Sequence, residues 1–122
     1  MEAKLHDLII FLEGSLETYH AVTLILEVTP YKSDKDDYTI WTYRVKTSSD
    51  DEYFDFINEF LDILENKYDA LAALGIKRSN ILFWLIYEYY GQCALGFSPQ
   101  EMKRLGANGI SLNVDCHQVA DE

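Results

Sequence analysis

The sequence has little cysteine and no long hydrophobic run. Two cysteines, Cys93 and Cys116, in 122 residues are too few for a disulfide scaffold. We expect both to be buried thiols in a reducing cytoplasm. The apolar run at 8–12 has only five residues, too short for a signal peptide, and the longer run at 81–90 contains Glu88. We therefore expect a cytoplasmic protein without a membrane segment.

Basic residues are also scarce. Ten lysines and arginines stand against 21 aspartates and glutamates, which gives a formal net charge of −11 at pH 7. This charge argues against binding to nucleic acid, because phosphates require the opposite sign. It argues equally against an anionic membrane surface. It favours fast association with basic proteins.

Catalytic and metal-binding motifs are absent. The chain has no C-x-x-C, H-E-x-x-H or G-x-S-x-G sequence, and its six glycines are too scattered for a phosphate loop. Cys116 and His117 are adjacent in a predicted strand, so they point to opposite faces and are poorly placed to share an ion. We expect no metal, no cofactor and no enzymatic activity.

The stretch 49–75 organises the rest of the chain. Ser49 and Glu52 form a capping box at its start, and Gly75 is a suitable residue to end it. Apolar residues recur in steps of three and four, which predicts one long amphipathic helix or two in succession. They are Tyr53, Ile57, Phe60, Leu64, Tyr68, Leu71 and Leu74. A break is expected near Asn66.

The opposite face of this stretch is acidic. From Asp50 to Asp69 there are eight acidic residues and one basic residue, Lys67. Like charges three or four residues apart repel one another, and nothing within the predicted helix compensates them. A solvated helix face explains the pattern. A docking surface for a basic partner explains it as well, with Asp51, Asp55, Glu59, Asp62 and Asp69 as the candidate binding residues.

The remaining segments predict alternating strands and helices. We expect strands at 5–13, 38–46, 81–90, 93–97 and 110–116, with helices after the caps Ser15 and Ser98. Period-two alternation in the last strand places Leu112, Val114 and Cys116 inward. The chain thus predicts a single α+β domain over 1–122. We expect a two-layer sandwich with helices on one face of a mostly antiparallel four- to five-stranded sheet, with ferredoxin-like connectivity.

Two further groups are candidate binding residues. Tyr87 and Tyr89 share one face of an aromatic strand, where they serve either core packing or an aromatic protein-binding site. The wet sheet face offers an alternative site for a small ligand or a reaction. Its residues are Arg44, Asn113, Asp115 and His117.

Several short stretches resemble a bacterial domain-of-unknown-function family, numbered 4279. Residues 22–30 are similar to its "I-T-x-L-L-G-L-x-P" pattern, with Glu27 in place of the family glycine. Trp41, the "L-S-P-E"-like segment 97–100 and the "G-L-x-L-x-x-D"-like segment 109–115 follow in the same order. The family implies no established activity for any residue. Small acidic bacterial domains of this kind resemble immunity proteins, which neutralise a cognate toxin, often a basic nuclease.

Together these features predict a non-enzymatic immunity protein that binds a basic toxin and covers its active site. Electrostatic steering by the acidic helix and anchoring by aromatic side chains would provide the binding. Two alternatives remain open. One is a small-ligand binder or enzyme that uses the sheet face, and the other is a homo-oligomeric domain that pairs through a strand edge.

Overall fold

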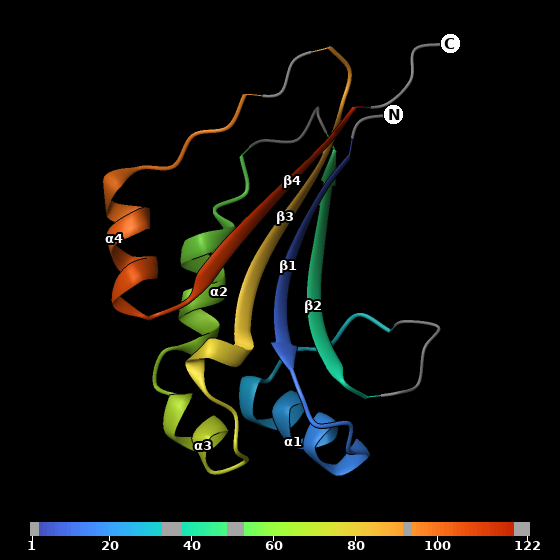
Figure 1. The fold of residues 1–122 in the computed structure, drawn as a ribbon, viewed down its shortest axis with the longest axis vertical. Helices are drawn as coiled ribbons and strands as arrows, with labels where there is room; N and C mark the ends of the chain where they lie inside the picture. Colours follow the sequence, from blue (N-terminus) through green and yellow to red (C-terminus); the bar gives the residue numbers. More distant parts are fainter. Residues whose placement is uncertain (1–2, 33–37, 49–52, 92–93, 119–122) are drawn as a thin grey trace.

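The computed structural model describes residues 3–32, 38–48, 53–91 and 94–118. Within these residues, four α-helices, one short 3₁₀ helix and four strands alternate along the chain (Figure 1). In order they are β1 (Ala3–Phe11), α1 (Leu16–Leu26), β2 (Ile40–Ser48), α2 (Phe56–Leu64), α3 (Tyr68–Ala72), η1 (Arg78–Asn80), β3 (Ile81–Tyr89), α4 (Pro99–Ala107) and β4 (Ser111–Gln118). No described helix is long and apolar enough to cross a membrane.

The strands form one sheet in the order β2-β1-β3-β4. β1 pairs antiparallel with both β2 and β3, so it occupies an interior position, as its apolar composition predicts. Leu8 and Ile10 on one face and Ile9 on the other are at most 9% exposed. Side chains on both faces of β1 are therefore buried at residues 8–10.

The connectivity is only partly ferredoxin-like. β2 and β3 run in the same direction on either side of β1, and α2 and α3 connect them, which is the split arrangement of that fold. β3 and β4, however, are parallel neighbours joined through α4. The sheet is therefore mixed, because a helical crossover brings β4 back in the direction of β3. This parallel pair corrects the expected ferredoxin-like order.

Helices α2 and α4 lie along one side of the sheet, and α1 and α3 lie near one end of it (Figure 1). The core forms between these layers. Trp41 from β2, Phe83 from β3 and Phe60 from α2 are each 0% exposed. Trp41 Nε1 donates to Thr23 Oγ1 at 3.0 Å, which ties α1 to β2. Trp41 thus lies on the face of β2 that packs against the helices.

The acidic stretch forms two helices, as its sequence allows. α2 begins after Asp55, and the predicted capping box at 49–52 lies outside the described residues. The chain breaks where expected, since Asn66 has a φ of 72° and Gly75 a φ of 83°. The predicted inward set is confirmed at Ile57, Phe60, Leu64 and Leu71, which are all buried. It is wrong at Tyr53 and Leu74, which lie outside both helices and are exposed.

Two expectations for the C-terminal part are corrected. The predicted strand at 93–97 is not a strand over residues 94–97, where Phe97 instead packs its ring against Phe56. In β4, Val114 and Cys116 are exposed rather than inward, because β4 continues past the end of α2 (Figure 1). Cys93 lies outside the described residues. The predicted cap Ser98 is confirmed, and it forms a capping box with Glu101 through hydrogen bonds of 3.0 and 3.1 Å.

Candidate functional site

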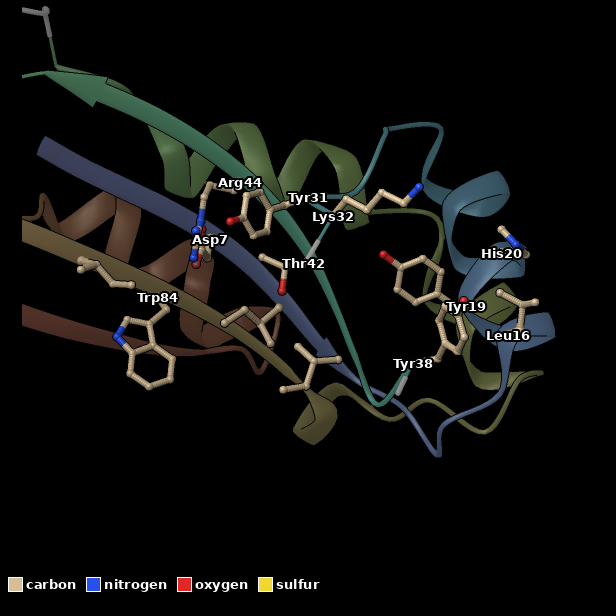
Figure 2. Close-up of a pocket in the computed structure, with 13 residues that line it drawn as sticks. Asp7, Leu16, Tyr19, His20, Tyr31, Lys32, Tyr38, Thr42, Arg44 and Trp84 are labelled. Atoms are coloured by element: carbon tan, nitrogen blue, oxygen red, sulfur yellow. Dashed lines mark hydrogen bonds and ion pairs between the residues drawn. The ribbon is translucent and has the colours of Figure 1, made fainter. Parts of the chain in front are cut away.

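A groove of about 620 Å³ lies on the sheet face opposite α2, between the sheet and α1 (Figure 2). Its floor comes from β1, β2 and β3, and its far end from the first turns of α1 and the segment that connects α1 to β2. The lining residues are Asp7, Ile9, Leu16, Tyr19, His20, Tyr31, Lys32, Tyr38, Ile40, Thr42, Arg44, Trp84 and Ile86. The volume is in the range of small-molecule sites.

A buried ion pair lies in the floor of the groove. Asp7 on β1 and Arg44 on β2 are opposite each other in the strand register. Arg44 Nε donates to Asp7 Oδ1 and Arg44 Nη2 to Asp7 Oδ2, each at 2.8 Å. The Asp7 side chain is 3% exposed and that of Arg44 is 25% exposed. The hydrogen bonds with Asp7 raise the pKa of Arg44, so the guanidinium stays charged.

Tyr31 covers this pair. After α1, Glu27 takes a left-handed conformation with a φ of 59°, and the chain then reaches the outer edge of β2. There the Tyr31 N–H donates to the Thr42 carbonyl oxygen at 2.6 Å. The Tyr31 ring lies 4.3 Å from the Arg44 guanidinium carbon, within range of a cation–π contact. One aromatic ring therefore shields the ion pair from solvent.

The walls of the groove are apolar and aromatic. Ile9, Ile40 and Ile86 come from three neighbouring strands, and Trp84 stands beside Asp7 on β3. Figure 2 shows Trp84 at one end of the groove and Tyr19 and Leu16 at the other. Trp84 Nε1 is buried and has no hydrogen-bond partner among the described residues. The surroundings suit the flat faces of an aromatic ligand.

The ionisable groups at the groove surface are basic. Lys32 and His20 are exposed, and Arg44 is partly exposed. The one carboxylate in the lining, Asp7, has both oxygens bonded to Arg44. Asp7 is consequently committed as an acceptor and is poorly placed to act as a general base.

The acidic helix residues lie elsewhere, on the helical layer. Glu59, Asp62 and Asp69 are exposed there, while Asp51 lies outside the described residues. Asp55 is partly buried and accepts a hydrogen bond from Asn58 Nδ2 at 2.8 Å. The structure thus presents three of the five predicted docking carboxylates to solvent.

Arg104 of α4 neutralises part of this acidic face. Its Nη2 lies 2.6 Å from both Asp62 Oδ1 and Glu65 Oε1, and its Nη1 donates to Asn58 Oδ1 at 2.8 Å. Asn108 Nδ2 adds a bond to Glu65 Oε2 at 3.0 Å. We call these five side chains the Arg104 network. Hydrogen bonds from Arg104 and then Asn108 lower the pKa of Glu65. The repulsion expected from the sequence is relieved between helices rather than within one.

The other predicted binding residues are not gathered into one site. Tyr87 and Tyr89 are half-buried with ring centroids 6.2 Å apart, and Lys4 Nζ lies 4.8 Å from the Tyr87 ring. Arg44 lies on β2, whereas Asn113, Asp115 and His117 lie on β4 at the opposite edge of the sheet. Three strand spacings, about 14 Å, separate these strands. Of this alternative set only Arg44 lines the groove.

Asp7 was not predicted as a site residue, although one signal in the sequence pointed to it. A charged side chain directly before the apolar run of a central strand requires a partner, and the outward-facing Arg44 of β2 was available. Nothing in the sequence indicated Tyr31, because its position depends on how the loop after α1 crosses the edge of β2. Among the described residues, no group of three or more His, Cys, Asp or Glu side chains is placed to hold a metal.

No protein-family model, curated protein or solved structure matches the chain. The resemblance to the family numbered 4279 therefore stays a prediction. One observation bears on it: the residue aligned with the family glycine, Glu27, has the left-handed φ that favours glycine.

Proposed function

We propose that this chain is a cytoplasmic, non-enzymatic binding protein whose binding site is the groove on the open face of the sheet. The observation that carries this proposal is the buried Asp7–Arg44 pair beneath Tyr31 in a groove of about 620 Å³. The pair leaves a rigid, largely apolar floor, because each charge satisfies the other. Rigid apolar grooves with a few fixed polar groups are typical of ligand sites.

The two tryptophans provide a direct test with the full chain. Trp84 lines the groove, whereas Trp41 is buried in the core and bonded to Thr23. A neutral planar probe, 2-naphthamide, is expected to shift the NMR signal of the Trp84 indole N–H and leave that of Trp41 in place. If the Trp84 signal does not move at millimolar probe, the groove is not a ligand site.

A pair of variants locates the binding. Thr42 is half-buried in the groove, so Thr42→Phe should fill it and abolish the Trp84 shift. Lys46 lies on the same strand and the same face but outside the lining, so Lys46→Phe should leave binding intact. An equal loss in both variants would contradict the assignment to the groove.

A second candidate is the immunity protein expected from the sequence. It is supported by the exposed carboxylates of Glu59 and Asp69, for which no ion pair is present among the described residues. Such a surface suits a basic protein, for instance a toxin nuclease domain, and opposes nucleic acid or an anionic membrane.

This candidate is tested by capture from the native lysate with matched charge reversals. The variant E59K/D62K/D69K should lose a basic protein that the wild type retains, and that protein's toxic activity should be absent in the complex. The control E13K/E88K/D115K changes the net charge equally but leaves the helical layer alone. If the control loses the partner too, overall charge rather than this surface controls binding.

A further inference from the structure

The charges that line the groove contrast with those of the chain. The sequence carries 21 acidic residues, yet the single acidic side chain in the lining, Asp7, is buried. Lys32, His20 and the exposed part of Arg44 present positive charge or donors to the groove. Among the described residues that line the groove, a ligand therefore meets donors and no exposed carboxylate.

We infer that the natural ligand of the groove is a planar aromatic monocarboxylate. The inference rests on the proposed binding function and specifies its ligand. Two observations support the inference. The basic side chains Lys32 and Arg44 line the groove, although Arg44 also pairs with Asp7, and aromatic rings form its walls.

The charge balance of the lining favours a single negative charge. Arg44 and Lys32 contribute two positive charges, and Asp7 removes one. These three side chains give the described lining a formal charge of about +1, which a carboxylate neutralises and a phosphate dianion exceeds. Arg44 uses Nε and Nη2 for Asp7 and also forms a side-chain hydrogen bond with Tyr31, so Lys32 is the less committed of the two basic side chains.

The shape and composition of the walls favour a flat body. Rings of Tyr19, Tyr31, Tyr38 and Trp84 and side chains of three isoleucines surround the space. The hydroxyl of Thr42 and those of the tyrosines add further hydrogen-bonding groups at its surface (Figure 2). A cationic ligand of the same shape would instead meet Arg44 and Lys32, and the described lining residues offer it no free acid to pair with.

Three probes of nearly identical shape test the charge. They are 2-naphthoate, 2-naphthamide and 2-naphthamidinium, with charges of −1, 0 and +1. Each is titrated into the full chain at pH 7 while the Trp84 and Trp41 indole signals are followed by NMR. We expect naphthoate to bind about fivefold or more tightly than the amide, because an ionised acceptor forms stronger hydrogen bonds, and the amidinium to bind most weakly.

Two substitutions with equal charge change localise the preference. Lys32→Gln removes an exposed groove lysine and should reduce naphthoate affinity severalfold with little effect on the amide. Lys103→Gln removes an exposed lysine of α4, outside the groove lining, and should change neither. A preference lost equally in both variants would overturn the inference in favour of a general charge effect.

The outcomes separate the inference from the proposal beneath it. Equal affinity for all three probes at Trp84, or preference for the amidinium, overturns the carboxylate inference and leaves the groove as a binding site. Failure of every probe to move the Trp84 signal overturns both.

Discussion

Glu27 is a single residue with a measurable conformational cost. It ends α1 with a φ of 59° and a ψ of 33°, where its N–H donates to the Thr23 carbonyl oxygen. A side chain in this region costs about 1–2 kcal/mol relative to glycine. Its carboxylate gains little in return, since its contact with Lys67 spans 3.7 Å between exposed side chains.

We therefore predict that Glu27→Gly stabilises the protein. The free energy of unfolding should rise by about 1 kcal/mol. Glycine relieves the backbone strain, but its greater flexibility in the unfolded chain offsets part of that gain. Urea denaturation measures the change. Glu27→Ala is the control, because it also removes the Lys67 contact but keeps the strain. A gain as large in Glu27→Ala would attribute the effect to charge.

The Asp7–Arg44 pair gives a second prediction at the residue scale. Arg44→Gln should lower the free energy of unfolding by about 3 kcal/mol, because it leaves the buried Asp7 carboxylate without its partner. Urea denaturation of this variant and of the double variant D7N/R44Q tests the reason. The double variant should regain most of the loss, since two neutral amides remain. If it is no more stable than Arg44→Gln, the pair is not the cause.

At the scale of elements, the Arg104 network joins α4 to α2. Because α4 lies in the connection between the parallel strands β3 and β4, this contact also holds that connection against the helix α2. Apolar contacts of α4 are few, and Leu105 is its buried residue. The polar network is thus a main attachment of this helix.

The network predicts a pH dependence of stability. The pKa of Glu65 in the folded state lies below its usual 4.5, so the unfolded chain takes up protons first as pH falls, and stability is lost below about pH 4.5. Arg104→Met should remove this contribution, about 1 kcal/mol or less at pH 7 because the groups are partly exposed. The decline in Tm between pH 5 and 3 should then be shallower.

Lys103→Met serves as the control for this measurement. Lys103 is an exposed neighbour on α4, and its replacement changes the net charge by the same amount. Its Tm should decline with pH as the wild type does. A shallower decline in both variants would show that net charge, not Glu65, sets the pH dependence.

The elements differ in how far the sequence predicts them. β1 was predictable because an apolar run needs cover on both faces, and α1 and α4 because Ser15 and Ser98 are good caps. The prediction of a strand at 93–97 was wrong. The apolar residue Phe97 suggested a strand, but its ring packs against Phe56 from a segment that is not a strand. The parallel β3–β4 pairing and the Tyr31 cover depend on where connections cross the sheet, which local patterns do not encode.

At the scale of the whole molecule, the excess negative charge is unevenly distributed. The described residues contain twelve acidic and nine basic side chains, whereas the remaining segments of the sequence contain nine acidic and one basic. Aspartates 34, 36 and 37 belong to the second group. Most of the net charge thus belongs to segments other than the described residues.

We predict that salt stabilises the folded protein. Salt screens the mutual repulsion of the excess acidic residues, because the Debye length falls from about 30 Å at 10 mM to below about 10 Å at 200 mM sodium chloride. The Tm should therefore be higher in 200 mM than in 10 mM sodium chloride. The variant D34N/D36N/D37N reduces the net charge and should respond less to salt. A Tm that is independent of salt in the wild type would show that the excess charges do not interact across the fold.

The parallel β3–β4 pair also has a consequence for protein synthesis. The ribosome completes β1, β2 and β3 before α4 and β4, and the 30 or so residues that contain α4 and β4 take roughly 2–6 s to follow at ordinary elongation rates. The antiparallel pairs of β1 with β2 and β3 do not depend on β4, and the outer edge of β3 stays unpaired until β4 joins it. That edge, which includes Phe83 and Trp84, is where a nascent chain of this protein is most exposed to chaperones and to neighbouring chains on the same messenger.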